Sequence, residues 1–352
     1  MIQVLRRNLF QTLKMIIYGR WPERSDIEAG YTILLAIPAD MPFLLQFALL
    51  GLRHLQMPNC RQILVISDGA ASDHTLRMLV TAHGDERVQY VPLALIDKVL
   101  INLPRSDGSA NYRHFTQILR GVLAATTEAI YLHDADAFWL EQGGIESQYR
   151  EFCERGMYTL GVTPRIDAMF KDRGLDMPGT WELMFSSSWA RTRPPVEMKC
   201  GWYPLPDGEW RWFDTMLFGQ YMDYASGRVG VMANPPKFVH FYGTIVQYRC
   251  WQRAGHSRSW EDELFCLLLL SVLAEAIAGT RCEIPLPRPH ELARGLRDPA
   301  APITYLAKTA PKRYASFRRG IENLCSSPAF GNDVASRIRT LVAPFDKHFS
   351  FA

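Results

Sequence analysis

The stretch IYLHDADAFWLE, residues 130–141, places two carboxylates directly after an apolar run. The run IYL has the composition of a buried strand near its end. Asp134 and Asp136 follow one residue apart, so their like charges repel each other unless a cation lies between them. An Asp-x-Asp sequence also occurs by chance, as a helix cap or a solvated loop. The strand-end position favours a metal site, and hard oxygen ligands indicate Mg²⁺ or Mn²⁺.

The segments around this stretch alternate between apolar strands and amphipathic helices. Strands are predicted at residues 31–39, 61–69 and 87–93, and helices at residues 42–57, 71–84 and 111–128. Strands made almost entirely of Ile, Leu and Val that alternate with helices predict a mostly parallel, doubly wound α/β sheet with helices on both faces.

Four acidic residues fall on one edge of this predicted sheet. Asp40 follows the first strand, Asp68 the second, and Asp134 with Asp136 a later one. Ligands of such sheets bind beyond the carboxyl ends of the strands, where these side chains project. The chain has no GxGxxG and no GxxxxGKS/T motif, which argues against a dinucleotide-binding fold and a P-loop.

The overall composition argues against nucleic-acid binding. Thirty-nine basic and 36 acidic residues give a net charge of +3, too even a balance for a protein that neutralises phosphates. Seven cysteines are scattered without a CxxC pair. Such a set is typical of reduced thiols, and we expect a cytoplasmic protein.

Both ends of the chain are predicted to be helical. Residues 1–28 open with MIQVLRRNLFQTLKMII, a basic amphipathic helix that either docks on the protein itself or makes peripheral contact with the inner membrane surface. The apolar run at residues 264–279 is shorter than the ~20 residues that span a bilayer and contains Glu275. It predicts a buried helix within a helical C-terminal extension, residues 251–352.

Two later segments carry candidate functional residues. Five of the nine tryptophans lie within residues 181–212. Some must fill the core, but exposed indole faces also stack on sugars, and we expect at least one to do so. Farther on, Asp214 precedes a predicted helix, and His240 lies in an extended segment. Each residue taken alone also fits a helix N-cap or a hydrogen-bonded core histidine.

Taken in order, these segments resemble the GT-A glycosyltransferases, in particular the family 2-like group. The resemblance covers residues 31–245. Its four matching segments are AIPADMPFLLQFALLGLRHL, VISDG, ANYRHFTQILRGVLAATTEAIYLHDAD and FDTMLFGQYMDYASGRVGVMANPPKFVH. It implies a Rossmann-like GT-A sheet with the nucleotide-sugar-binding half at residues 29–150 and the acceptor-binding half at residues 151–250.

The resemblance also implies roles for individual residues at the nucleotide and the metal. Asp134 and Asp136 would hold the metal and the donor diphosphate, and His240 would be a further ligand. Asp68 would read the nucleotide base. Pro38, Ala39 and Asp40 would also lie at the nucleotide. Negative charge develops on the leaving diphosphate, and cations such as Arg249, Arg253 or Arg258 would stabilise it. Solvation at the surface is the alternative for these three arginines.

Asp214 would be the general base that deprotonates the acceptor. The sequence departs from the family pattern here, because Phe213 stands where the family usually has the first acid of a pair. Glu209 and Asp207 are therefore alternative bases.

The expected activity is transfer of a hexose from a nucleotide diphosphate sugar, with UDP as the carrier, to a hydroxyl group. The resemblance favours inversion at the anomeric carbon, and retention is the alternative because retaining enzymes share the fold and similar metal ligands. A carbohydrate, a lipid-linked glycan and a small molecule all fit as acceptor, and the oligomeric state stays open. One alternative is a non-catalytic nucleotide- or sugar-binding relative, which the Phe213 departure keeps open. A sugar nucleotidyltransferase is another, although AIPADMPF lacks the Gly-rich basic loop that such enzymes carry. An aspartyl-phosphate phosphatase would need Thr or Val where Phe138 stands.

Overall fold

The computed structural model describes residues 18–69, 72–102, 110–165, 167–241, 245, 268, 270–279 and 310–349. The predicted basic helix MIQVLRRNLFQTLKMII lies outside these residues. The rest of the predicted N-terminal segment, residues 18–28, is not helical, because residues 18–27 form a turn and an irregular stretch and Glu28 begins a strand. The chain divides into two compact units. Unit 1 comprises Met1–Leu45, Gln56–Ala135 and Gly143–Pro235, and unit 2 comprises Gln46–Leu55, Asp136–Gln142 and Pro236–Ala352. The predicted donor and acceptor halves both contribute strands to unit 1, and their separate roles stay a prediction.

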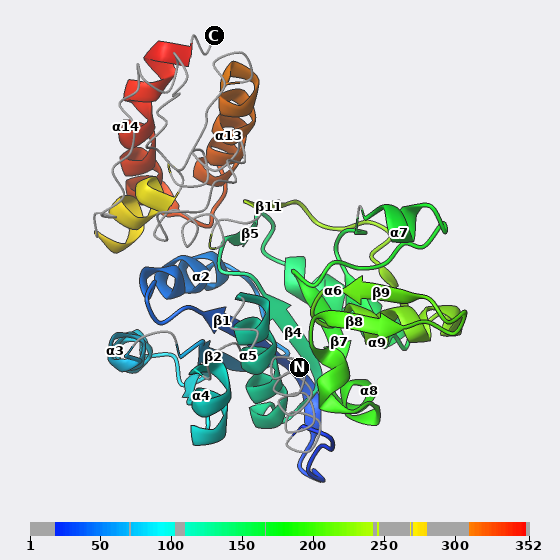
Figure 1. Cartoon of the computed structure of the whole chain (residues 1–352). Helices are drawn as coiled ribbons and strands as arrows, with labels where there is room; N and C mark the ends of the chain where they lie inside the picture. Colours follow the sequence, from blue (N-terminus) through cyan, green and yellow to red (C-terminus); the bar gives the residue numbers. More distant parts are fainter. Residues whose placement is uncertain are drawn as a thin grey trace, which may run out of the picture. The chain divides into compact units, whose positions relative to one another are not determined.

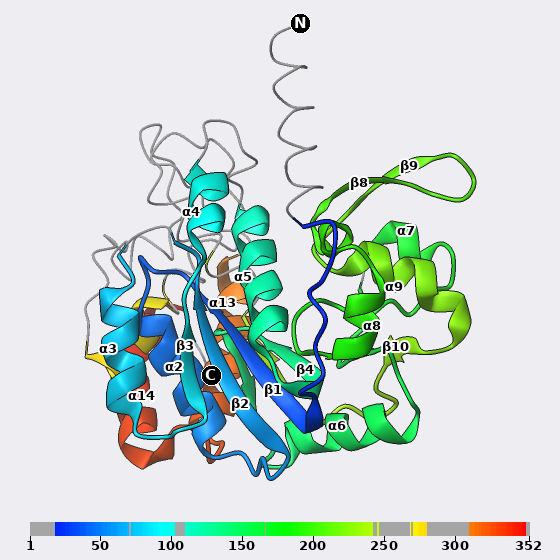
Figure 2. The same ribbon diagram turned by 90° about the horizontal axis from the view of Figure 1, so that it is seen from below.

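Unit 1 is built on a seven-stranded sheet with the order β10-β6-β7-β4-β1-β2-β3 (Figures 1 and 2). β7 is antiparallel to both its neighbours, β4 and β6, and the other pairs are parallel. The prediction of a mostly parallel α/β sheet is confirmed. The strands are β1 (Glu28–Ile37), β2 (Cys60–Ser67), β3 (Val88–Val91), β4 (Thr127–His133), β6 (Thr159–Gly161), β7 (Leu183–Ser186) and β10 (Val229–Val231).

Helices cover both faces of this sheet. Leu34 of β1 packs against α5 (Ala110–Ala124) at Gly121, where a β-carbon would lie 2.5 Å from the leucine side chain. Tyr31 points to the opposite face, and its hydroxyl donates to Glu146 of α6 (Gly144–Glu154) over 2.8 Å. Successive strand residues alternate between faces, so α5 and α6 lie on opposite sides, as predicted.

The remaining elements of unit 1 are short, and several were not predicted. The predicted helix at 111–128 ends earlier, because Thr127 begins β4. Strands of three or four residues, such as β6 and β7, carry too little alternation to be recognised. The elements of unit 1 outside the seven-stranded sheet and its helices α5 and α6 are α3 (His74–His83), α4 (Leu95–Asn102), α7 (Ala168–Lys171), α8 (Ser187–Thr192), α9 (Leu217–Asp223), two 3₁₀ turns (Pro195–Met198 and Tyr224–Ser226) and the hairpin of β8 (Gly201–Pro204) and β9 (Trp210–Phe213). α2 (Phe43–Arg53) begins in unit 1 and ends in unit 2.

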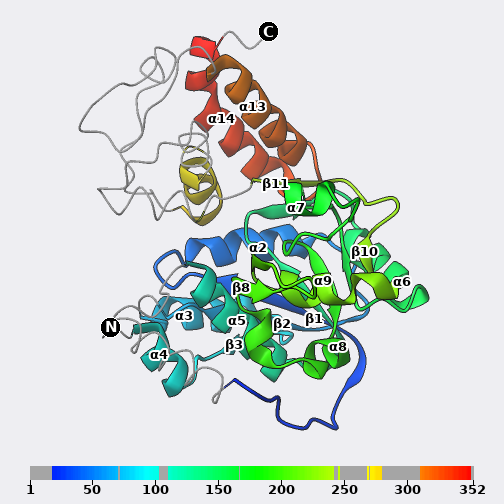
Figure 3. The same cartoon turned by 45° about the vertical axis from the view of Figure 1, so that its right-hand side comes forward.

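Unit 2 joins a small strand pair to C-terminal helices. β5 (Ala137–Trp139) pairs antiparallel with β11 (Phe238–His240), and Phe138 lies 5.3 Å from the ring of Phe330. α13 (Ala310–Cys325) and α14 (Gly331–Phe349) lie side by side (Figures 1 and 3). The described part of the run 264–279 is helical and mostly buried. These elements confirm the helical C-terminal extension, and no described helix is both long and apolar enough to span a membrane.

Candidate active site

The turn between β4 and β5 carries the two predicted metal ligands. Asp134 and Asp136 lie within this turn. Asp136 is 5% exposed and Asp134 is partly exposed. A carboxylate this deeply buried is costly to keep ionised unless a positive charge compensates it.

The register of β5 with β11 supplies the third ligand. His240 pairs with Ala137, the residue after Asp136, and the amide of Phe241 donates to the Asp136 carbonyl. The His240 Nε2 atom consequently lies 3.3 Å from Asp136 Oδ1. His240 is therefore beside the acidic pair although more than a hundred residues separate them.

Asp134, Asp136 and His240 form a set of side chains that fits a divalent ion. Each offers one ligand atom, and these atoms all lie within 4.8 Å of one another. Two carboxylate oxygens and one imidazole nitrogen suit Mg²⁺ or Mn²⁺, which complete their coordination with water and phosphate oxygens. The predicted metal ligands are thus brought together.

Glu182 was not predicted as a site residue, yet its hydrogen bonds hold the carboxyl end of β4 in place. Its fully buried carboxylate accepts hydrogen bonds from the Tyr131 hydroxyl and, over 3.2 Å, from the amide of Asp134. His133 Nδ1 lies 2.7 Å away. Glu182 also has a φ of 51°, a left-handed conformation that is strained for a residue other than glycine. This contact network fixes the backbone from which Asp134 projects.

The ends of β1 and β2 meet at the same edge of the sheet. The Ala39 amide donates to Asp68 Oδ1 over 3.0 Å, and the Asp68 side chain is buried. Gln117 of α5 donates to the carbonyls of Ile37 and Ile66, which ties the two strand ends together. Pro38 is buried beside Ala39, whereas Asp40 is exposed. The predicted nucleotide residues are therefore adjacent, and their contact with a nucleotide stays a prediction.

Asp214 lies outside the three-residue cluster of candidate metal ligands, but a chain of contacts links it to Glu182. Arg165 Nη1 lies 3.3 Å from Asp214 Oδ2, and the same guanidinium lies 5.4 Å from the Trp181 ring centroid. Trp181 directly precedes Glu182, which holds the Asp134 amide. The predicted helix start at Asp214 is three residues early, because α9 begins at Leu217.

The two alternative bases lie on the β8–β9 hairpin. Glu209 is exposed and pairs with Arg211 at 2.6 Å, and Asp207 lies 3.8 Å from Arg173. Arg249 and Arg253 lie outside the described residues, so their predicted contact with the donor diphosphate stays a prediction.

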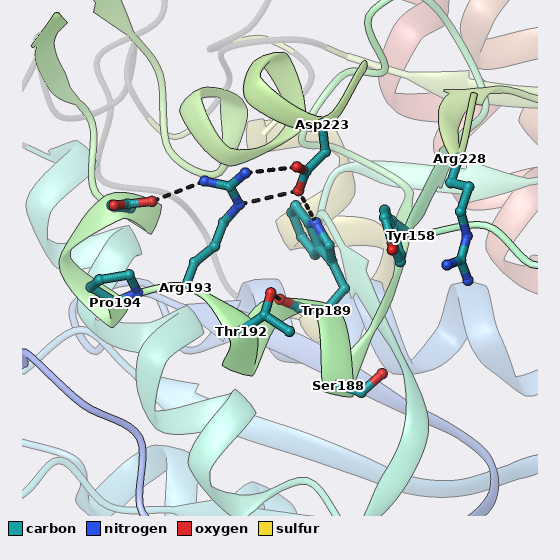
Figure 4. Close-up of a pocket in the computed structure, with 9 residues that line it drawn as sticks. Tyr158, Ser188, Trp189, Thr192, Arg193, Pro194, Asp223 and Arg228 are labelled. Carbon is teal, nitrogen blue, oxygen red and sulfur yellow. Dashed lines mark hydrogen bonds and ion pairs between the residues drawn. The ribbon is translucent and has the colours of Figure 1, made fainter. Parts of the chain in front are cut away.

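A cavity of about 600 Å³ lies at the opposite edge of the sheet, beside the amino ends of β6 and β10 (Figure 4). Arg193 makes two hydrogen bonds to Asp223, and the Trp189 indole donates to the same carboxylate over 2.6 Å. Arg193 also pairs with Glu197 at 3.1 Å. These groups satisfy one another, so the cavity is lined by a structural ion-pair network.

Comparison of the structure with solved structures finds glycosyltransferases at low identity. TarS 1-349 of S. aureus in complex with UDP-GlcNAc matches with a TM-score of 0.39 and 10% identity over 91% of this chain and 89% of that chain. Mannosyltransferase PcManGT of Pyrobaculum calidifontis, in complex with GDP-Man and Mn²⁺, matches with a TM-score of 0.40 and 12% identity over 97% of this chain and 92% of that chain. Glucosyl-3-phosphoglycerate synthase of Mycobacterium tuberculosis matches with a TM-score of 0.41 and 10% identity over 71% of this chain and 86% of that chain. No protein-family model and no curated protein matches the chain.

The buried Glu182 carboxylate gives the first prediction. Glu182→Gln keeps the side-chain shape but removes the charge that accepts these hydrogen bonds, so we expect a loss of about 2–4 kcal/mol of unfolding free energy. Mn²⁺ affinity should also fall about 10- to 100-fold, because the Asp134 backbone loses its support. Urea denaturation and calorimetric Mn²⁺ titration measure the two effects.

Glu146→Gln is the matched control. Glu146 is also buried and accepts hydrogen bonds from Tyr31 and Asn59, but at the amino end of the strands. This variant should lose comparable stability and keep Mn²⁺ affinity. Equal loss of Mn²⁺ binding in both variants would contradict a positioning role for Glu182.

The Asp223 network predicts a pH-dependent stability. Burial alone would raise the pKa of Asp223, but the hydrogen bonds from Arg193 and Trp189 outweigh it and hold that pKa below its ordinary value. The stabilisation is therefore complete above the unfolded pKa of about 3.9 and disappears as the pH falls through the lower folded value. Asp223→Asn should cost about 1–3 kcal/mol at pH 7.

Urea denaturation between pH 7 and pH 3 measures this difference. We expect the gap between wild type and Asp223→Asn to narrow below about pH 4. Asp26→Asn is the control, because Asp26 pairs with Arg24 on the surface and should show little effect. A gap that stays constant down to pH 3 would contradict the assignment.

Proposed function

We propose that this protein is a metal-dependent glycosyltransferase that moves a sugar from a nucleotide diphosphate sugar, with UDP as carrier, to an acceptor hydroxyl with inversion. The observation that carries the proposal is the cluster of Asp134, Asp136 and His240 at the end of β4, with ligand atoms within 4.8 Å of one another. Two carboxylates at the carboxyl edge of an α/β sheet lie where such sheets bind ligands.

The three clustered residues would hold Mn²⁺ or Mg²⁺. When bound, such an ion neutralises the charge that develops on the departing nucleoside diphosphate. The protein's own part is to keep the ligands in place before the donor arrives. Glu182 holds the Asp134 backbone, and the β5–β11 register holds His240 beside Asp136. A preorganised site of this kind needs little rearrangement during the reaction.

The donor nucleotide would lie along the ends of β1 and β2. Pro38, Ala39 and Asp40 follow β1, and Asp68 follows β2 at the same edge. The hydrogen bond between Ala39 and Asp68 holds these two strand ends together. The end of β4, where the diphosphate would meet the metal ligands, is next to the end of β1 in the sheet.

Asp214 would take the proton from the acceptor hydroxyl. Its side chain is partly exposed, and Arg165 and the Thr215 amide orient its two oxygens. Glu209 is a weaker choice, because it lies on an exposed hairpin and its carboxylate is more open to solvent than that of Asp214. A base must be held within hydrogen-bond reach of the proton that it removes, which favours the oriented carboxylate.

The central prediction concerns Asp136. Isothermal titration of the wild type with UDP should show binding in Mn²⁺ and much weaker binding in EDTA. Asp136→Asn keeps the size of the side chain but removes a ligand charge, so Mn²⁺-dependent affinity for UDP should fall at least about 100-fold. UDP-GlcNAc and GDP-Man are the further probes.

Glu86→Ala is the control for Asp136→Asn, because Glu86 is an exposed acid in the turn before β3. It should bind UDP as the wild type does. Binding that is equally strong with and without Mn²⁺ would contradict the proposed metal site. Metal-dependent binding without turnover on any acceptor would identify a non-catalytic relative.

A separate prediction concerns the base. Asp214→Asn keeps the hydrogen-bonding shape but cannot accept the proton, so the rate of sugar transfer should fall about 100- to 10,000-fold. Binding of UDP with Mn²⁺ should stay unchanged. Transfer assays with a panel of nucleotide sugars, run beside UDP titrations, separate the two effects. Retained transfer would move the base elsewhere, with Glu209→Gln as the next variant.

A further inference from the structure

The β8–β9 hairpin presents three tryptophans on one side. Trp202 of β8 pairs directly with Trp212 of β9, and Pro204 pairs with Trp210. Directly paired residues point to the same face of a two-stranded ribbon, as do residues two apart on one strand. Trp202, Trp210, Trp212 and Pro204 therefore form one surface, which we name the tryptophan face.

The tryptophan face is open to solvent. Trp202 and Trp210 are each 62% exposed and Trp212 is 44% exposed. Among the described residues, few large apolar side chains are this exposed, and these three lie together on one hairpin. Figure 2 shows the β8–β9 hairpin projecting from the neighbouring elements of unit 1. Clustered exposed aromatic side chains of this kind mark a binding surface.

The opposite side of the hairpin holds it rigid. Tyr203 stacks on Phe218 of α9 with ring centroids 4.1 Å apart, and its hydroxyl donates to the Lys199 carbonyl over 2.7 Å. Phe213 is buried in the same cluster. The turn is closed by the Leu205 amide, which donates to the Glu209 carbonyl over 2.7 Å. A platform that is already ordered loses little conformational entropy when a ligand binds.

We propose that the tryptophan face binds an oligosaccharide of pyranose sugars. The face of an indole ring carries negative charge density, and the C–H groups on the apolar side of a pyranose ring complement it. Trp210 and Trp212 are about 7 Å apart along the strand. A single sugar covers one indole, so the whole face requires a chain of several sugars.

The charges at the rim favour a neutral ligand over a membrane. The hairpin turn carries Asp207 and Glu209, and the nearby cations are committed to them. Arg211 pairs with Glu209, and Arg173 contacts Asp207 and donates to Tyr221. This rim has no cationic excess to attract anionic lipid headgroups. Its carboxylates can instead accept hydrogen bonds from sugar hydroxyls.

The area of the tryptophan face is too small for a stable protein interface. At 150–250 Å² per tryptophan, the exposed fractions amount to roughly 250–420 Å². A stable protein interface takes about 800 Å² from each partner. An oligosaccharide of a few residues matches the available surface.

Assignment of this oligosaccharide as the acceptor rests on the proposed function, but its binding does not. The test therefore uses the full-length protein in EDTA without nucleotide. Cellohexaose, chitohexaose, maltohexaose and laminarihexaose are titrated by calorimetry and followed by tryptophan fluorescence. We expect at least one to bind, and the double variant Trp202→Ala/Trp212→Ala to bind it at least about tenfold more weakly.

Two control variants show whether binding is specific to the tryptophan face. Leu95→Ala removes an apolar side chain that is 79% exposed elsewhere in unit 1, and it should leave binding unchanged. Asp136→Asn should also keep oligosaccharide binding, so failure of the metal site and failure of the tryptophan face give different results. Thermal melts show whether each variant is folded.

Either of two results overturns the inference. In the first, none of the four hexasaccharides binds to the wild type. In the second, the double variant binds them as strongly as the wild type does. If the first result is found and the wild type sediments with phosphatidylglycerol–phosphatidylethanolamine vesicles in a tryptophan-dependent way, the face is a membrane contact.

Discussion

The antiparallel insertion of β7 beside β4 is the constraint on which the candidate site depends. Because β7 runs against β4, the residue that precedes β7 lies at the carboxyl end of β4. That residue is Glu182, whose buried charge requires several hydrogen-bond donors. The donors available there are the Tyr131 hydroxyl, the His133 ring and the Asp134 amide. Hydrogen bonding to this one buried carboxylate therefore fixes the backbone of the turn that carries the candidate metal ligands.

The same edge of the sheet concentrates negative charge in a small volume. Glu182 is matched by protein donors, whereas Asp134 and Asp136 project from the turn toward His240. Asp136 is the more buried of the two carboxylate ligands, so its ionised form depends more on a nearby positive charge. A divalent ion shared with a diphosphate would supply that positive charge while the two carboxylates and His240 keep their positions. In the proposed function, donor binding would thus be coupled to the local electrostatic balance.

Much of this arrangement was predictable from the sequence, because strand-end carboxylates leave a local pattern. Asp134 and Asp136 follow an apolar run, and Asp68 closes a second one. Glu182 leaves no such pattern, since neither its left-handed backbone nor the antiparallel β7 can be recognised from four strand residues. The β8–β9 hairpin did leave a signal that was missed. Pro206, Asp207 and Gly208 are turn formers between two aromatic runs, in WYPLPDGEWRWF.

The two proposed binding sites lie on different structural supports. The carboxyl edge of the sheet holds its carboxylates directly after buried strands, where a small displacement would change the distances between like charges. The tryptophan face lies on a hairpin whose inner side packs on α9 through Tyr203. Stacking on sugar rings tolerates small shifts along the ring, so a two-stranded ribbon is a sufficient support. Ligand-atom geometry is strict for a metal and loose for stacking. Buried strand ends therefore suit the proposed metal site, and an exposed hairpin suits the proposed sugar-binding surface.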